Sequence, residues 1–571
     1  MLRRDFLTHA SLSAVALATG CTPESPSTIG GNVTIIDAHC HVFNASDLPA
    51  VRFLRQVVFE DYPKQAYRML AIPDPDVTDW TLQLFLHLLG ADRAPTADEE
   101  IAYLKDGTGE EKNALSPEKA RAAASEDTAQ FLLMVDRRRR ERLSLMSAEE
   151  QEKRQPASED KFLNYILGDQ VRQLRADTTV TLTVARSASQ RAFSSLGPVS
   201  RYLNWFSLFR LYRHVLVERL ISDTTQQGFN PIMLTPALVD YDMWLYETVD
   251  NSPLRRQMVV MDVIAQRMAR KKAGPVVHGY MGFDPLREVA FRANKTKLSS
   301  LTTAREALED HGFIGVKLYP PMGFRPSGNK PPYPKRTVDA LGFYPDKELD
   351  GVLKDLYKLC VDLDAPILAH GYSSNGSGPN YEKRGDPAFW IPVFREFPSL
   401  RVCIAHFGRF DARSSGREDL QLPEGSWEWR LGEYIKANTQ RNVVADISYL
   451  SEVLTAKPKQ RAFIATSFKR WISEFDPGCD HILYGSDWIM LGKEAGYDYY
   501  IASINAFLRN DCGLSDDTCD KIFRRNALRF LPLERGSRGR NRLLSYYRKN
   551  GLDASRLPSA SPRLLAEIWG R

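Results

Sequence analysis

The feature that most constrains this 571-residue chain is a repeated alternation of short apolar runs with longer amphipathic runs of helical period. The short runs have strand length and number eight: 33–37, 232–238, 276–283, 313–318, 366–370, 402–406, 443–447 and 482–485. Helical patterns lie at 256–271, 303–310, 349–363, 387–397, 427–437, 461–474 and 499–509. From the second run onward, the runs end roughly 35–55 residues apart, which leaves room for one strand, one helix and two loops. Eight such units predict an α/β fold, a closed (β/α)8 barrel, rather than an open sheet.

Residues that bind metals recur where these runs end. They close the first, fifth, sixth and eighth runs: His39, His41, His370, His406 and Asp487. Because side chains alternate along a strand, His39 and His41 face the same way and Cys40 faces the opposite way. Two imidazoles on one face are a ready pair of ligands for an ion such as zinc. Barrels of this kind carry their chemistry at the carboxyl ends of the strands, where all these residues lie.

A long segment separates the first strand from the second. Residues 46–229 are rich in helix formers and charge, and we expect a helical insertion that leaves the active-site end of the barrel. The predicted organisation is a signal and linker at 1–31, a barrel made of 32–45 and 230–531, this insertion, and a basic C-terminal tail at 532–571. Such an insertion could cap the pocket, select the substrate or contact another subunit in a homo-oligomer.

The N-terminus has the grammar of an export signal. Arg3-Arg4, followed by Phe6-Leu7 and an apolar stretch too short to span a bilayer, resembles a twin-arginine signal. The sequence Ala-Thr-Gly before Cys21 resembles a lipoprotein cleavage box, so Cys21 is a candidate for lipidation. These features predict an exported protein, either periplasmic or anchored by lipid to the membrane of a bacterial envelope.

Bulk composition excludes several classes of protein. The net charge of +5 gives no electrostatic reason to expect nucleic acid as a partner, and the basic run 137–140 is interpreted as a solvated helix face. Seven cysteines in 571 residues are not a disulfide framework. Cys40 and Cys403 adjoin candidate ligands, and both are expected to point away from the site, between barrel and helices.

Four motifs together resemble the amidohydrolase superfamily. They are Asp37–His41, Ala369-His370, Ala405-His406 and Gly485–Trp488, in that order on strands 1, 5, 6 and 8. More narrowly they resemble the amidohydrolase-related group that includes aminocarboxymuconate semialdehyde decarboxylase. The resemblance covers strand 1 and residues 230–531 but not the insertion.

The resemblance implies a role for each matched residue. His39, His41, His370 and Asp487 would bind one divalent metal, with zinc the expected ion, and Asp487 would also accept a proton from the activated water. His406 would act as acid and base beside the metal. Three imidazoles and a carboxylate leave one position open for water or substrate. His278 and the remaining histidines are assigned to structural roles.

Two cations near the predicted site leave alternatives open. Lys317 ends the fourth strand and is interpreted as a group that binds a substrate carboxylate. In other branches of the superfamily this lysine is carboxylated and bridges a second metal, which is the alternative here. Arg409, three residues after His406, could hold a substrate anion or form a salt bridge at the rim.

The same residues suit more than one reaction on a small organic molecule, which could carry a carboxylate. The first hypothesis is a hydrolase in which metal-activated water attacks a carbonyl, ester, lactone or amide carbon. The second is a non-oxidative decarboxylase, a lyase in which the metal anchors the substrate and His406 or Asp487 protonates the carbon that loses carbon dioxide. A third, weaker hypothesis is an envelope protein that binds without catalysis.

Overall fold

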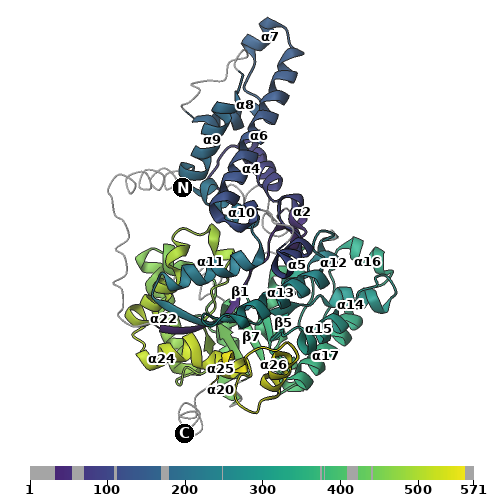
Figure 1. Ribbon diagram of the computed structural model, residues 1–571, viewed down its shortest axis with the longest axis vertical. Coiled ribbons are helices and arrows are strands. Elements are labelled where there is room, and N and C mark those ends of the chain that lie inside the picture. Colours follow the sequence, from purple (N-terminus) through teal and green to yellow (C-terminus); the bar gives the residue numbers. More distant parts are fainter. Residues whose placement is uncertain are drawn as a thin grey trace.

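The computed structural model describes residues 33–54, 70–107, 112–168, 179–246, 249–372, 376–378, 380–407, 422–438 and 442–559. Parallel strands form the centre of the molecule, and an arm of helices stands out from one end of them (Figure 1). Among the described residues, no helix combines the length and apolar character needed to cross a bilayer.

Nine strand segments form the eight predicted strands. They are β1 (Val33–Cys40), β2 (Phe229–Pro236), β3 (Val276–Val277), β4 (Tyr280–Gly282), β5 (Gly315–Leu318), β6 (Ile367–His370), β7 (Val402–Ala405), β8 (Val443–Asp446) and β9 (Ile482–Leu483). Every neighbouring pair is parallel. The predicted strand 276–283 is divided into β3 and β4 at His278 and Gly279.

Hydrogen bonds join the two sheets at both of their edges. A parallel bridge links Ala237, just after β2, to Tyr280 of β4. At the other edge the Ala38 amide donates to the Tyr484 carbonyl at 3.1 Å, and the Asp487 amide donates to the His39 carbonyl at 2.8 Å. Because these bonds connect the last strand to the first, the predicted α/β barrel is confirmed.

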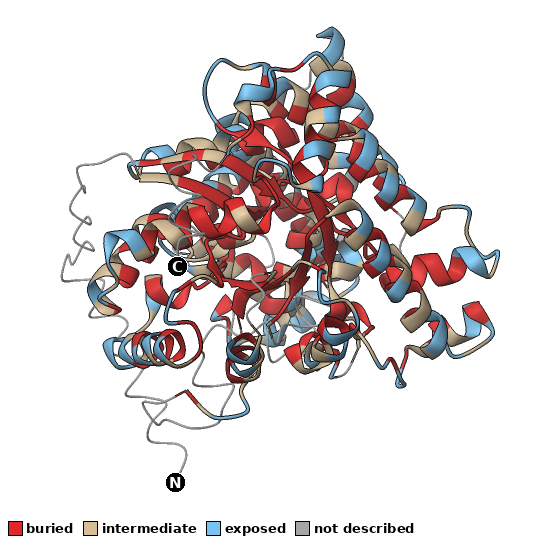
Figure 2. Ribbon diagram, turned by 90° about the horizontal axis from the view of Figure 1, so that it is seen from below, coloured by how far each residue is buried: buried red, intermediate tan, exposed pale blue. Residues whose placement is uncertain are grey.

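Two apolar layers hold the barrel together. Residues inside it, such as Leu368 of β6, cluster with Met233 and Leu483. The alternate residues Ile367 and Ala369 pack against the surrounding helices. Burial on both faces explains why the strands appear in the sequence as continuous apolar runs, and Figure 2 shows the central strands buried almost throughout.

The barrel helices follow the predicted pattern. They include α13 (Leu254–Arg270), α14 (Pro285–Arg292), α15 (Ser300–Asp310), α17 (Asp346–Leu363), α18 (Ile391–Glu396), α20 (Trp427–Ala437), α22 (Pro458–Phe475) and α23 (Tyr500–Ala506). Two further helices, α12 (Asp242–Leu245) and α16 (Lys335–Leu341), lie in loops that follow strands.

Helices fill the long segment between β1 and β2. They are α2 (Ala50–Arg52), α4 (Pro75–Leu88), α5 (Ala97–Asp106), α6 (Pro117–Ser144), α7 (Ala148–Lys153), α8 (Ser158–Leu167), α9 (Leu182–Ser195), α10 (Pro198–Leu208) and α11 (Arg213–Thr225). Helix α7 lies at the tip of the arm, and α10, α11 and α5 lie near the barrel (Figure 1). The basic run 137–140 lies on α6 and is not uniformly solvated, because Arg139 is buried and ion-paired with Asp136 at 2.9 Å.

A C-terminal helix, α26 (Arg538–Lys549), covers the amino end of the barrel. Its residues Leu543 and Tyr547 join the apolar cluster inside the barrel. The Arg542 guanidinium donates to the carbonyls of Leu308, Phe313 and Ile314, just before β5, at 2.5–2.8 Å. Part of the segment whose basic composition predicted a tail is therefore packed structure.

Candidate metal centre

His39 and His41 lie at the end of β1 with one ring nitrogen of each already engaged. Nδ1 of His39 lies 3.0 Å from Asp446 Oδ2, and Nδ1 of His41 lies 2.7 Å from the Ala237 carbonyl. Because both partners are acceptors, the proton of each neutral ring belongs on Nδ1 and the lone pair on Nε2. Both Nε2 atoms lie near Asp487 Oδ1, at 3.4 Å for His39 and 3.2 Å for His41.

Backbone geometry turns two of the predicted residues into the site. His406, directly after β7, and Asp487, in the loop after β9, both adopt left-handed conformations, with φ of 64° and 56°. By simple alternation His406 would face the helices, since its neighbour Ala405 belongs to the cluster inside the barrel. Such conformations cost about 1–3 kcal/mol in non-glycine residues and concentrate at functional sites.

Gly485 is required for the close approach of β1 to the last strand. A Cβ atom built on Gly485 would lie 2.7 Å from the His39 Cβ. Only glycine therefore allows the chain before Asp487 to pass beside His39.

Three side chains form a group able to hold an ion. One ligand atom from each of His39, His406 and Asp487 lies within 4.8 Å of the others, and all three residues are buried. The other two predicted ligands adjoin this group. His41 contacts Asp487 as above, and His370 Nδ1 lies 3.1 Å from His406 Nε2. The structure thus brings together all five residues that the strand ends predicted. The group of three includes His406, which was expected to act as acid and base, and does not include the expected ligands His41 and His370.

The protonation states suit metal binding. Burial lowers the pKa of His406 to about 3 and that of His370 well below its usual range, so both rings are neutral at pH 7. Burial alone would raise the pKa of Asp487, but the neighbouring histidines, with His41 Nε2 at 3.2 Å, hold it below its usual range. Neutral imidazoles beside an ionised carboxylate are the donor set that zinc prefers, so the residues present fit a divalent ion.

Lys317 lies inside this group. Its Nζ is 3.1 Å from His39 Nε2, and the side chain is 3% exposed. Burial lowers the pKa of Lys317 to about 8, against the opposing effect of Asp487 and Asp446. The other candidate cation, Arg409, and the candidate lipidation site, Cys21, lie outside the described residues.

The sequence analysis missed Asp446, at the end of β8. Its carboxylate accepts from His39 Nδ1, from the His406 amide at 2.9 Å and from the Ser448 amide at 3.0 Å. Burial alone would raise its pKa, but His39 holds the pKa below the usual range of an aspartate. The available signal was a carboxylate near the end of the seventh apolar run.

Two smaller expectations had different outcomes. Cys40 packs in the cluster between barrel and helices, as expected. Cys403 does not, because it lies inside the barrel with its Sγ 3.5 Å from Asp446 Oδ2. His278 is structural: Nδ1 donates to the Gly312 carbonyl at 2.7 Å, and Nε2 lies 3.1 Å from the Tyr547 hydroxyl.

Comparison with known families gives one match within the barrel. Residues 294–533 match the family model described as amidohydrolase. The match contains β5 to β9 and with them Lys317, His370, His406, Asp446 and Asp487. It begins after β1, so His39 and His41 lie outside it.

Similarity to individual proteins is more distant. Nuclear distribution protein PAC1 of Gibberella zeae is 29% identical over 103 residues, which are 16% of this chain and only 22% of that protein's length. Among solved structures, an amidohydrolase from Burkholderia multivorans is 12% identical, with a TM-score of 0.37, over 57% of this chain and 90% of that chain. A protein from Pseudomonas putida described as a 2-pyrone-4,6-dicarboxylic acid hydrolase is 15% identical, with a TM-score of 0.31, over 55% and 87%. The 4-oxalomesaconate hydratase of Rhodopseudomonas palustris is 15% identical, with a TM-score of 0.31, over 59% and 84%.

Proposed function

This chain is related to the amidohydrolase family through residues 294–533, and from that premise we propose that it is a metal-dependent hydrolase of a small organic substrate. The reaction proposed is attack of activated water on a carbonyl, ester, lactone or amide carbon. The observation that carries the proposal is the convergence of His39, His406 and Asp487 within 4.8 Å at the carboxyl ends of the barrel strands.

His39, His41, His370 and Asp487 would hold one divalent ion, which we propose to be zinc. When bound, such an ion lowers the pKa of a water ligand toward ~7 and polarises a carbonyl oxygen. Asp487, ionised and in contact with both β1 histidines, is suited to accept a proton from the attacking water. His406, with Nδ1 2.9 Å from the Ser448 hydroxyl, would carry that proton to the leaving group.

The position of Lys317 supports a second arrangement of the metal site. An ammonium 3.1 Å from His39 Nε2 would repel an ion bound at that nitrogen. Lys317 must therefore move, as it would when it pairs with a substrate carboxylate, or lose its charge. Carboxylation would convert the ammonium into a carbamate anion, which could bind a second ion together with His370 and His406. Elemental analysis of the purified protein separates these cases, because the first gives one metal per chain and the second gives two.

One observation favours decarboxylation as the alternative reaction. The Tyr319 ring lies 4.4 Å from the His370 ring, and the Tyr241 ring lies 5.3 Å from that of Tyr319. This aromatic wall beside the proposed ligands suits a planar conjugated acid, the type of molecule whose carbanion is stabilised when carbon dioxide leaves. His406 or Asp487 would then protonate the carbon.

A product screen with two variants tests the proposal. Purified protein loaded with zinc is assayed with esters, lactones, amides and aromatic carboxylic acids, and both new carboxylates and carbon dioxide are measured. We expect His406→Asn to abolish turnover and keep about one equivalent of metal, and His39→Ala to lose the metal. A His39→Ala protein that binds metal like the wild type would contradict the ligand assignment, and a fully active His406→Asn protein would contradict the role of His406.

We also propose that the protein is exported and anchored through Cys21, on the strength of residues 1–31 alone. Fractionation of cells that carry Arg3-Arg4→Lys-Lys tests export, since a twin-arginine substrate should then accumulate in the cytoplasm. Radiolabelled fatty acid incorporated by the wild type but not by Cys21→Ser would support the anchor.

A further inference from the structure

We propose that the corner between α10 and α11 of the helical insertion is part of the metal centre, with Trp205 and Arg213 as positioning residues. This corner fixes the two loops that carry His41 and Asp487. The inference rests on the proposed metal-dependent function and adds to it a reason for the insertion: it constructs the site rather than merely covering it.

Trp205 holds the loop that follows the last strand. The indole Nε1 donates to the Ile489 carbonyl at 2.7 Å, two residues after Asp487, and the side chain is buried. The ring also fills the space beside Gly492, where a Cβ atom would lie 2.7 Å from Trp205 Cδ1. Movement of this loop away from α10 would therefore displace Asp487.

The same loop is connected directly to His41. The His41 amide donates to the Trp488 carbonyl, next to the residue that Trp205 binds. The His41 ring lies 5.4 Å from Phe43, whose ring lies 5.8 Å from Phe209 at the end of α10. One short stretch of the insertion thus contacts both loops.

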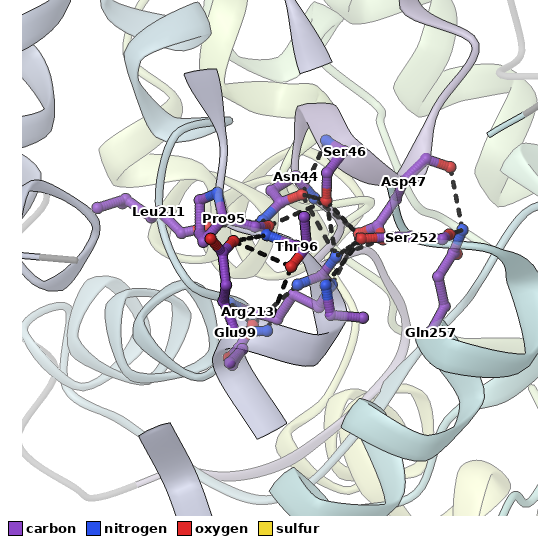
Figure 3. Close-up of polar contacts among 12 residues, drawn as sticks. Asn44, Ser46, Asp47, Pro95, Thr96, Glu99, Leu211, Arg213, Ser252 and Gln257 are labelled. Atoms are coloured by element: carbon purple, nitrogen blue, oxygen red, sulfur yellow. Dashed lines mark hydrogen bonds and ion pairs between the residues drawn. The ribbon is translucent and has the colours of Figure 1, made fainter. Parts of the chain in front are cut away.

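Arg213 holds the loop after β1 through a buried ion network (Figure 3). Its guanidinium binds Asp47 at 2.5 Å and Glu100 of α5 at 2.9 Å, and the Arg213 and Glu100 side chains are fully buried. Asn44, three residues after His41, donates to the Leu211 carbonyl at 3.2 Å and to the Pro95 carbonyl at 2.9 Å. The loop after His41 is therefore bonded to the insertion on several sides.

The charge balance makes this network rigid. Burial alone would lower the pKa of Arg213, but Asp47 and Glu100 raise it, so the guanidinium remains charged. A buried pair that loses one partner leaves an uncompensated charge, which strongly favours the single arrangement in which all partners meet. Rigid support of ligands is what keeps metal affinity high, and loss of a supporting partner typically weakens it 10–100-fold.

Two matched tryptophan substitutions test the inference. Trp205→Phe keeps an aromatic ring and removes the donor to Ile489. Trp80→Phe makes the same change in the arm, where Nε1 of Trp80 donates to the Ser158 hydroxyl at 3.2 Å. Zinc alone is the probe, and its dissociation constant is measured by competition with a chromophoric chelator on the full chain, with circular dichroism to check folding.

We expect Trp205→Phe to weaken zinc binding about tenfold and Trp80→Phe to leave it unchanged. Equal zinc affinities in wild type, Trp205→Phe and Trp80→Phe would overturn the inference while leaving the proposed function intact. A wild-type protein that binds no zinc would instead overturn the proposed function, and this inference with it. Arg213→Lys, which keeps the charge but loses the fork of donors, should weaken binding as well, and the tryptophan pair decides the matter if that variant does not fold.

Discussion

Replacement of Asp446 by asparagine should switch the tautomer of His39. In the native protein Asp446 Oδ1 accepts from the amides of His406 and Ser448, while Oδ2 accepts from His39 Nδ1 at 3.0 Å. The asparagine oxygen must stay with the two backbone donors, because buried amides without acceptors are costly, at about 1–3 kcal/mol each. The new NH2 group then faces His39 Nδ1, which has to become an acceptor.

The consequence for metal binding follows from the second nitrogen of the ring. With Nδ1 an acceptor, the proton of His39 moves to Nε2, the atom 3.4 Å from Asp487 Oδ1. A protonated Nε2 has no lone pair for an ion. We expect zinc affinity to fall ~10–100-fold, which is about 1.4–2.7 kcal/mol. The metal-free protein should also lose about 1.5–3 kcal/mol of unfolding free energy with the charged hydrogen bond.

The assay separates the two effects with a second aspartate. Asp476 accepts from the amides of Asp480 and His481 at 3.0 and 2.9 Å, just before β9 and so at the opposite end of the barrel. Asp476→Asn should lower the unfolding free energy, measured by urea titration, without changing the zinc dissociation constant. If Asp446→Asn binds zinc as tightly as the wild type, the tautomer argument is wrong.

Three further predictions concern the barrel itself. Burial lowers the pKa of His278 from 6.5 to about 4, so the unfolded chain binds a proton between these values that the folded chain does not, and stability falls as the pH drops. In urea titrations, the loss of unfolding free energy from pH 7 to pH 5 should be about 2 kcal/mol smaller in His278→Gln than in the wild type, where other buried histidines add to it. Gly485→Ala forces a Cβ against His39 and should lower the melting temperature, with a loss of about 1–3 kcal/mol of unfolding free energy. Its control is Gly351→Ala on α17, where a Cβ has nothing within 4 Å and the unfolding free energy should rise by up to about 1 kcal/mol. Arg542→Met removes the three hydrogen bonds that a partly buried guanidinium donates and should destabilise by about 3 kcal/mol or more in the same titration; an unchanged midpoint would mean that these hydrogen bonds contribute little to stability.

The architecture of the barrel could be predicted because its signals are local. Strand length, apolar character and helical period are properties of neighbouring residues, and they located all eight strands. The break at Gly279 was not visible, because it depends on a contact: a Cβ there would lie 2.8 Å from the Pro236 carbonyl. Helix α26 was missed for a related reason. Its basic composition was interpreted as a tail, but Leu543 and Tyr547 pack in the cluster inside the barrel.

The sequence predicted the candidate metal ligands but not the residues that hold those ligands in place. Histidines at strand ends are conspicuous, because a polar imidazole at the end of an apolar run requires a bonding partner when it is buried. Asp446 gave a weaker signal, because one carboxylate at a strand end also suits a helix cap or a turn. The contact of Trp205 with Ile489 joins residues 284 positions apart, and no property of neighbouring residues encodes such a pairing.

The barrel closes at the residues that would bind the ion. The Asp487 amide bonds the His39 carbonyl at 2.8 Å, and the His41 amide bonds the Trp488 carbonyl, so the seam between first and last strands runs through the proposed ligands. In the unfolded chain His39 and His41 remain neighbours, but Asp487 and His370 are far away in sequence, so a complete ligand set exists only after closure. An ion that binds the closed barrel alone stabilises it by about 2.7 kcal/mol at a hundred times its dissociation constant. Because the closing hydrogen bonds are made by backbone groups, the barrel can close before the ion arrives, and the ion then stabilises the seam that created its site.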